Sequence, residues 1–227
     1  MDQLGLDNGQ FADRRDAGKK LGKALARFKG PDTVVLALPR GGVVIGVEVA
    51  KELQAPLGLV LVRKIGHPTF SEYAIGAVAE GQEPIYNQSE IGSLDKAWLK
   101  QAETAAKSLI AKRRSLYFGG KVPEPDIRGK IVVIVDDGVA TGLTMEAAIK
   151  SVVRAGPNNV VIAVPVAAAE SVSMLKQLAN EVIILDNPNN FLGAVGSHYL
   201  DFPQVDDSEV QSLLMEAYGY IHPEAKL

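Results

Sequence analysis

Two adjacent carboxylates, Asp136 and Asp137, stand where a buried strand passes into a turn of small residues. The run Ile131 to Val135 is continuous, apolar and rich in β-branched side chains, which is typical of a strand covered on both faces. Residues 138–144 are mostly small or hydroxyl-bearing, and helical spacing resumes over residues 145–153. The order of strand, acidic pair, turn and helix indicates a phosphate site with two carboxylates at its rim.

The residue types in this turn suit a phosphate and a sugar together. The first turn of a helix has unpartnered N–H groups and the positive end of the helix dipole, so it attracts an anion. Gly138 and Gly142 would let the backbone approach a phosphate closely, and Thr141 and Thr144 would add hydroxyl donors. The two acids would repel phosphate, so sugar hydroxyls, or a magnesium ion bound by sugar and pyrophosphate, should face them. A 5-phosphoribosyl group has that shape.

Residues 133–144, Val-Ile-Val-Asp-Asp-Gly-Val-Ala-Thr-Gly-Leu-Thr, resemble the phosphoribosyl pyrophosphate (PRPP) signature of the type I phosphoribosyltransferases. The resemblance implies that Asp136 and Asp137 hold the ribose 2- and 3-hydroxyls and meet Mg²⁺ indirectly, through ribose or water. It also implies that the loop holds the 5-phosphate, through Gly138, Val139, Ala140, Thr141, Gly142, Leu143 and Thr144. The alternative is a strand-to-helix turn whose acids only end the strand and cap the helix.

A second strand, turn and helix precede the acidic pair. Residues 33–38 predict a buried strand and residues 43–53 an apolar helix, with Pro-Arg-Gly-Gly between them. Paired glycines expose N–H groups, and an arginine beside them can add a charge-assisted contact to an anion. The resemblance makes this turn the pyrophosphate loop, with an unusual backbone conformation, and makes its ligands Arg40, Gly41 and Gly42. The alternative is a tight turn with a surface arginine.

Two further pairs of cations need an interpretation. The strand predicted over residues 57–62 ends in Arg63 and Lys64. Ligands of open α/β sheets bind beyond the carboxyl ends of the strands, so both are candidates for pyrophosphate oxygens, with a solvated charge pair as the alternative. Arg14 and Arg15 fall in an amphipathic helix predicted over residues 11–25, and are interpreted as part of its solvated face.

Residues 64–120 are predicted to form a lid and a helical insertion. The segment is irregular up to a hairpin around residues 80–83, and helical spacing then runs from Glu90 to Tyr117. Type I phosphoribosyltransferases carry a mobile lid at this point, which makes lid candidates of His67, Glu72 and Tyr73. The long helix is suited to an oligomer interface, and we expect a homo-oligomer.

Ala140 departs from the hypoxanthine–guanine branch of the family, which has an aspartate there to exchange a proton with the purine. The adenine branch has a small residue at this position and takes its carboxylate from the lid. Glu72 therefore becomes the catalytic candidate for that work, beside the acidic pair. The acceptor base stays open.

Residues 187–227 are predicted to form a small hood over the acceptor base and a C-terminal tail. Phe191, Tyr199 and Phe202 would stack on a flat base, and Asp201 or His198 would hydrogen-bond its edge. The alternative is that the aromatic side chains pack against the sheet.

Composition limits the classes of protein that fit. With 227 residues, 47% hydrophobic and 22% charged, the chain can form one substantial α/β domain. A formal net charge of −3 without a basic stripe argues against nucleic-acid binding. The polar, acidic start and the lack of an apolar run of about 18 residues predict neither a signal peptide nor a membrane span. The absence of cysteine fits a reducing compartment, and we expect a cytoplasmic location.

Strands and helices alternate along the chain, which predicts an α/β fold with a mainly parallel open sheet and helices on both faces, in one domain over residues 1–227. The predicted function is Mg²⁺-dependent transfer of the 5-phosphoribosyl group of PRPP to a nitrogenous base, with release of pyrophosphate. Two alternatives are a PRPP- or nucleotide-binding regulatory protein without transfer activity and, less favoured, a metal-dependent phosphohydrolase.

Overall fold

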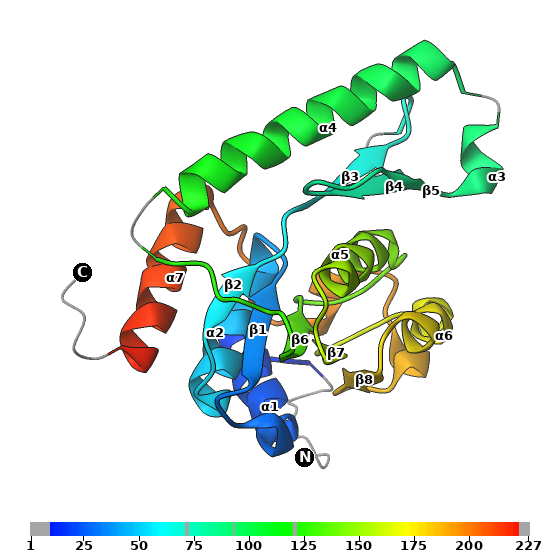
Figure 1. The fold of residues 1–227 in the computed structure, drawn as a ribbon. Coiled ribbons are helices and arrows are strands. Elements are labelled where there is room, and N and C mark those ends of the chain that lie inside the picture. Colours follow the sequence, from blue (N-terminus) through cyan, green and yellow to red (C-terminus); the bar gives the residue numbers. More distant parts are fainter. Residues whose placement is uncertain (1–9, 71–72, 93, 120–121, 223–227) are drawn as a thin grey trace.

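The fold is organised around a five-stranded parallel sheet, seen in a computed structural model of the chain (Figure 1). The structure describes residues 10–70, 73–92, 94–119 and 122–222. Neighbouring strands follow the order β2-β1-β6-β7-β8, and each pair is parallel. The strands are β1 (Thr33–Ala37), β2 (Leu57–Leu59), β6 (Ile131–Val135), β7 (Asn159–Val164) and β8 (Glu181–Ile184). The predicted parallel sheet is confirmed, and the strand that leads into the acidic pair lies at its centre.

Helices cover both faces of this sheet. On one face are α1 (Arg14–Ala24), α2 (Gly41–Leu53) and α7 (Asp207–Ile221), and on the other α5 (Leu143–Arg154) and α6 (Ala169–Leu178). Val35 and Val133 pack into the first core, whereas Val34 and Val132 pack into the second. Because successive side chains of a strand point to opposite faces, one continuous apolar run fills both cores.

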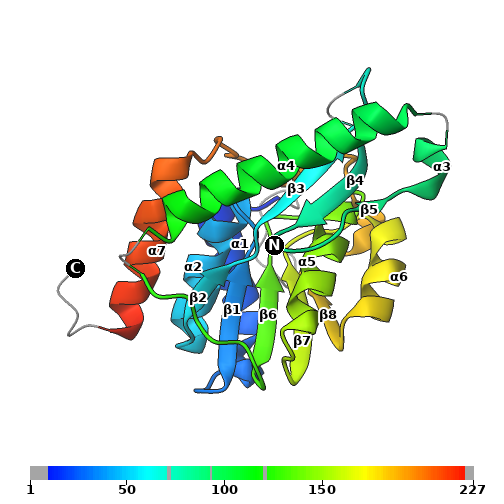
Figure 2. The same ribbon diagram turned by 45° about the horizontal axis from the view of Figure 1, so that its top comes forward.

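A second sheet lies beyond the carboxyl ends of the main strands (Figure 2). It is antiparallel and consists of β3 (Val62–Gly66), β4 (Ala74–Ala79) and β5 (Ile85–Tyr86). The pairing of β4 with β5 confirms the hairpin predicted around residues 80–83. Ala77 and Ala79 pack with Leu143 and Ala147, so this sheet rests on α5, the helix that follows the acidic pair.

The helix predicted from Glu90 to Tyr117 is divided in two, α3 (Gln88–Ile91) and α4 (Lys96–Tyr117). Asp95 begins the second helix as its N-cap, because its side chain accepts a hydrogen bond from the Ala97 N–H at 3.1 Å. α4 extends from the second sheet to α7, where the Tyr117 hydroxyl donates to Asp207 at 2.5 Å (Figure 1). Within the described ranges, no helix combines the length and apolar character that a membrane span needs.

Residues 198–203 form a short strap beside the acidic pair, and this strap pairs with Phe11 and Ala12 near the start of the described chain. The Phe11 N–H donates to the His198 carbonyl at 2.8 Å, and the Leu200 N–H donates to the Phe11 carbonyl at 2.8 Å. In the segment predicted as hood and C-terminal tail, residues 207–221 form α7, which packs against α2. The short 3-10 helices are Ala26–Phe28, Pro188–Asn190 and Val195–His198.

Candidate active site

The two acids follow the carboxyl end of β6 and press directly against the start of α2. That helix begins at Gly41, two residues earlier than predicted, so both glycines of the turn belong to its first turn. A Cβ at Gly42 would lie 2.8 Å from Asp136 Oδ1, and a Cβ at Gly41 would collide with Asp137 Oδ2. These two glycines therefore let the two loops touch. Contact of either glycine with pyrophosphate stays a prediction.

Burial controls the electrostatics of the acidic pair. It raises the pKa of Asp136 well above its ordinary value, and the neighbouring charge of Asp137 raises it further. Burial also raises the pKa of Asp137, while the Arg14 guanidinium opposes that rise. The Asp137 N–H donates to Asp136 Oδ1 at 2.9 Å. Carboxylates that are desolvated and crowded in this way are typical of a functional site.

Arg14 is the site residue that the sequence interpretation missed. Its Nε donates to Asp137 Oδ2 at 2.8 Å, and its side chain is 9% exposed. The solvated position predicted for it is therefore wrong. Arg15, by contrast, is 40% exposed and pairs with Glu48 and Glu216. The cap at Asp13, which fixes where α1 begins, is a signal in the sequence for the helix start, but no local pattern pairs residue 14 with residue 137.

The signature loop is anchored to the β7–α6 connection. Val139 exchanges backbone hydrogen bonds with Val166 and Ala168 at 3.0 and 2.8 Å, and the Ser171 hydroxyl donates to the Ala140 carbonyl. Ala140 and Thr141 are exposed, and α5 begins directly after them at Leu143. Its first-turn N–H groups point toward the loop, as a phosphate cradle requires.

The loop glycines have structural reasons to be glycine. Gly142 is the N-cap of α5 with φ +80°, a left-handed conformation that favours glycine. A Cβ at Gly138 would lie 2.6 Å from Val195 and 2.7 Å from Val166. Backbone conformation therefore explains Gly142, and close packing explains Gly138, without a phosphate. Within the described chain, the hydroxyls of Thr141 and Thr144 have no hydrogen-bond partner, so both can still serve a ligand.

The cations around the pyrophosphate loop are placed differently from the prediction. Arg40 is the N-cap of α2, is half-buried, and follows a cis peptide bond after Pro39. Arg63 and Lys64 lie inside β3, not at the end of a main strand. Adjacent strand residues point to opposite faces, so the two cannot both face the same ligand. Arg63 is the one that shares a small cavity with Pro39.

The hood residues differ in their exposure. Tyr199 is buried, its hydroxyl donates to the Asp137 carbonyl at 2.6 Å, and its ring packs against Phe11 and Phe202. The prediction that Tyr199 stacks on a base is therefore wrong, because its ring is already enclosed. Phe191 is half-buried and stacks on His198 at 5.3 Å between ring centroids, so its contact with a base stays a prediction.

The lid is described only in part. Glu72 lies outside the described residues. On either side of it, the His67 N–H donates to the Tyr73 carbonyl at 2.8 Å, and the Tyr73 hydroxyl donates to Glu90 at 3.1 Å. Both contacts are local to the second sheet and α3, so a role of His67 or Tyr73 toward a ligand stays a prediction.

The site fits Mg²⁺ only as an ion held mainly by a ligand. Over the described ranges, no group of three or more His, Asp or Glu side chains could hold a metal ion. One oxygen of Asp137 is also taken by Arg14. Asp136 and Asp137 could therefore meet the ion through ribose or water, as expected, while oxygen atoms of the ligand supply most of its coordination.

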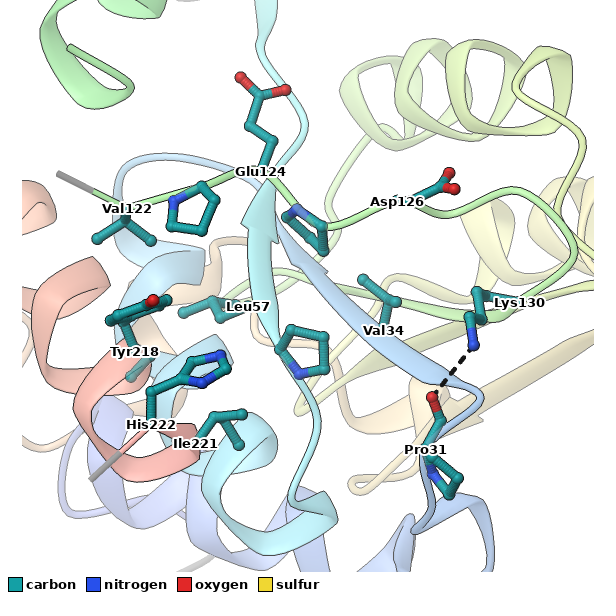
Figure 3. A pocket seen from close by; sticks show the side chains of 14 residues that line it. Pro31, Val34, Leu57, Val122, Glu124, Asp126, Lys130, Tyr218, Ile221 and His222 are labelled. Carbon is teal, nitrogen blue, oxygen red and sulfur yellow. Dashed lines mark hydrogen bonds between the residues drawn. The ribbon is translucent and has the colours of Figure 1, made fainter. Parts of the chain in front are cut away.

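A cavity of about 210 Å³ lies near the amino-terminal ends of the main strands. It is lined by residues that precede the strands, such as Pro31 and Lys130, and by Tyr218 and His222 near the end of α7 (Figure 3). Asp136 and Asp137 follow the carboxyl end of β6 instead. This cavity is therefore separate from the acidic pair.

Comparison with known proteins agrees with this geometry. The profile of the phosphoribosyl transferase domain matches residues 10–200, and the chain therefore belongs to this family. A crystal structure of the protein TT1426 from Thermus thermophilus is 45% identical with a TM-score of 0.75, over 91% of this chain and 98% of that one. A purine phosphoribosyltransferase from Pyrococcus horikoshii is 18% identical with a TM-score of 0.45, over 85% of this chain and 89% of that one.

A curated relative from Mycobacterium tuberculosis, named provisionally as a phosphoribosyl transferase, is 40% identical over 210 residues. The aligned region is 92% of this chain and 47% of that protein. The chain thus spans about half the length of the curated relatives it matches.

Proposed function

We propose that the protein transfers the 5-phosphoribosyl group of PRPP to a nitrogenous base and releases pyrophosphate. The observation that carries the proposal is the acidic pair, half-buried between the start of α2 and the loop that leads into α5. Two helix N-termini next to two carboxylates suit a ligand with phosphate groups at both ends and a diol between them. PRPP is such a ligand.

Each part of the ligand has a place in this arrangement. Asp136 and Asp137 would accept hydrogen bonds from the ribose hydroxyls. The 5-phosphate would lie on the α5 N-terminus, and pyrophosphate would lie toward Arg40 and Arg63. Mg²⁺ bound with PRPP would neutralise part of the pyrophosphate charge.

The reaction needs little covalent participation by the protein. A base nitrogen bonds to ribose C1 while the bond from C1 to pyrophosphate breaks, and the bonding electrons leave with pyrophosphate. The proton lost by the base nitrogen needs an acceptor, and the lid carboxylate Glu72 is our candidate. Positive charge develops on the ribose near C1, so the buried acids can stabilise it by position and charge.

The test is a screen for release of pyrophosphate from PRPP and Mg²⁺, with purine and pyrimidine bases offered singly. We expect base-dependent release by the wild type and a loss of about 100-fold or more in Asp137→Asn, because a carboxylate that acts on the charged transition state is removed. Lys112→Ala is the control, since Lys112 is exposed on α4. Equal activities of the two variants would contradict the assignment.

Ala140 supports one alternative, a PRPP-binding regulatory protein. Its methyl side chain cannot exchange a proton, and its carbonyl accepts a hydrogen bond from Ser171. Saturable PRPP binding without pyrophosphate release, for every base offered, would favour this alternative. Release of phosphate from phosphate esters in the absence of any base would instead indicate a phosphohydrolase.

A further inference from the structure

Arg14 contacts three parts of the site at once. Its Nε donates to Asp137 Oδ2 at 2.8 Å, and its Nη1 donates to the Pro203 carbonyl at 2.6 Å. The guanidinium also lies 3.6 Å from the centre of the Phe202 ring, a cation–π contact. Together these contacts join α1, the acidic pair and the strap that follows Tyr199.

Arg14 contacts only one of the two Asp137 carboxylate oxygens. Arg14 uses Oδ2, whereas no N–H group of another described residue bonds Oδ1. The main chain of Asp137 is fixed as well, because its carbonyl accepts the Tyr199 hydroxyl and its N–H donates to Asp136. A side chain held at one oxygen and at its backbone presents its other oxygen in a fixed direction.

The charge of Arg14 is better explained by the positioning of Asp137 than by a gain in the stability of the fold. A buried ion pair gains little net stability, since both partners lose their hydration. In this pair, however, Arg14 compensates one of two adjacent acids that would otherwise repel each other at close range.

We propose that Arg14 is a positioning residue of the ribose site, which holds Asp137 by one carboxylate oxygen and aims the other at a ribose hydroxyl. The inference rests on the proposed function and deepens it, because it separates the roles of the two acids. Asp137 is compensated and held in place, while Asp136 makes no direct ion pair with a cation among the described residues. The same geometry predicts that the effect of Arg14 is confined to the ribose end of the ligand and is absent at pyrophosphate.

The neighbouring residue supplies a matched control. Arg15 is in the same turn of α1 and makes ion pairs to Glu48 and Glu216 at 2.7 and 2.8 Å. It does not contact Asp137. Replacing either arginine with glutamine removes one charge and the contacts of one guanidinium from α1, but only Arg14→Gln changes the acidic pair.

The experiment measures the affinities of the purified protein for ribose 5-phosphate and for pyrophosphate, each with Mg²⁺, in the wild type, Arg14→Gln, Arg14→Lys and Arg15→Gln. We expect Arg14→Gln to weaken ribose 5-phosphate by about tenfold or more, the scale of one lost charge-assisted hydrogen bond, and to leave pyrophosphate within about twofold. Arg14→Lys should recover part of the loss, because it keeps the charge but not the planar fork. Arg15→Gln should leave both affinities near the wild-type values.

A double-substitution cycle separates positioning from general damage to the fold. In an Asp137→Asn background, adding Arg14→Gln should weaken ribose 5-phosphate by less than about threefold, because the carboxylate it positions is gone. If Arg14→Gln and Arg15→Gln have equal effects, or if the cycle is additive, the inference is wrong while the proposed function stands. If the wild type binds neither ribose 5-phosphate nor PRPP, the proposed function and the inference both fail.

Discussion

At the residue scale, the acidic pair is costly for the fold and useful for the ligand. Asp136 and Asp137 are adjacent and half-buried at the end of a central strand. Burial raises the pKa of both, and Arg14 compensates only one of them directly. A protein that did not need two carboxylates here would be more stable with neutral side chains, so the pair is best explained by what it binds.

The first prediction at this scale concerns stability without ligand. The pKa of Asp136 is higher in the folded state than its ordinary value of 3.8. Between that ordinary value and the raised folded value, the native protein therefore binds more protons than the unfolded chain. The contribution of Asp136 to the free energy of unfolding therefore falls as pH rises above about 4. We expect Asp136→Asn to be more stable than the wild type at pH 7, with a difference that shrinks at pH 4.

Urea unfolding of both proteins at the two pH values measures this effect. Asp201→Asn is the control, since Asp201 is exposed in the neighbouring strap and should change stability little. A lower stability of Asp136→Asn at pH 7, or a difference that does not depend on pH, would contradict the account.

The sequence predicted the acidic pair but not its partners. Strand, acids, glycines and helix are adjacent along the chain, so their order predicts where the acids lie relative to the sheet. Arg14 and Tyr199 reach Asp137 from 123 and 62 positions away. Their contacts depend on how α1 and the strap pack together, which no local pattern encodes. Tyr199 was expected at the ligand for its ring, whereas its hydroxyl holds the backbone of the site.

At the scale of elements, α1 is fixed by ion pairs as well as by its apolar face. Arg15 joins α1 to Glu48 of α2 and Glu216 of α7. The three helices cover the same face of the sheet, and α1 positions Arg14. The network therefore joins the three helices and makes no contact with the acidic pair.

The second prediction concerns this network. The Arg15 guanidinium lowers the pKa of Glu216 below its ordinary value of 4.5, so its stabilising contribution is present above that pH and is lost as pH falls through the folded value. We expect Glu216→Gln to lower the free energy of unfolding at pH 7 by about 0.5–1 kcal/mol, since the pair is partly exposed. The gap should close near pH 3.

Chemical unfolding between pH 7 and pH 3 measures both values, and Glu52→Gln on the exposed side of α2 is the control. If the gap between the wild type and Glu216→Gln were constant over this range, the ion pair would not be its source.

At this scale the sequence predicts the buried strands but not the change from the main sheet to the second sheet. Apolar runs located β1 and β6 well, because a strand buried on both faces has a continuous apolar pattern. The cations Arg63 and Lys64 were placed at the end of one strand, but the chain bends after Leu59 and a new strand begins at Val62. The run Leu57 to Val62 continues across the change of sheet without a turn residue between the two strands, so the change has no local signal.

At the scale of the whole molecule, two sheets enclose the region where we place the ligand. The main sheet and the N-termini of α2 and α5 form the proposed PRPP site, and the second sheet rests on α5 beyond the same strand ends (Figure 2). α4 connects that second sheet to α7 across the molecule (Figure 1). The predicted lid belongs to the segment that carries the second sheet, and this sheet lies beyond the strand ends where we place the ligand (Figure 2).

The most direct test of the account is a calorimetric titration of the protein with PRPP and Mg²⁺, on the wild type and on the Asp136→Asn, Asp137→Asn double variant. The account predicts saturable binding to the wild type and loss of that binding in the double variant, with the variant folded at the same temperature. Absence of binding to a folded wild type, or equal binding by the double variant, would contradict the assignment of the acidic pair as the PRPP site.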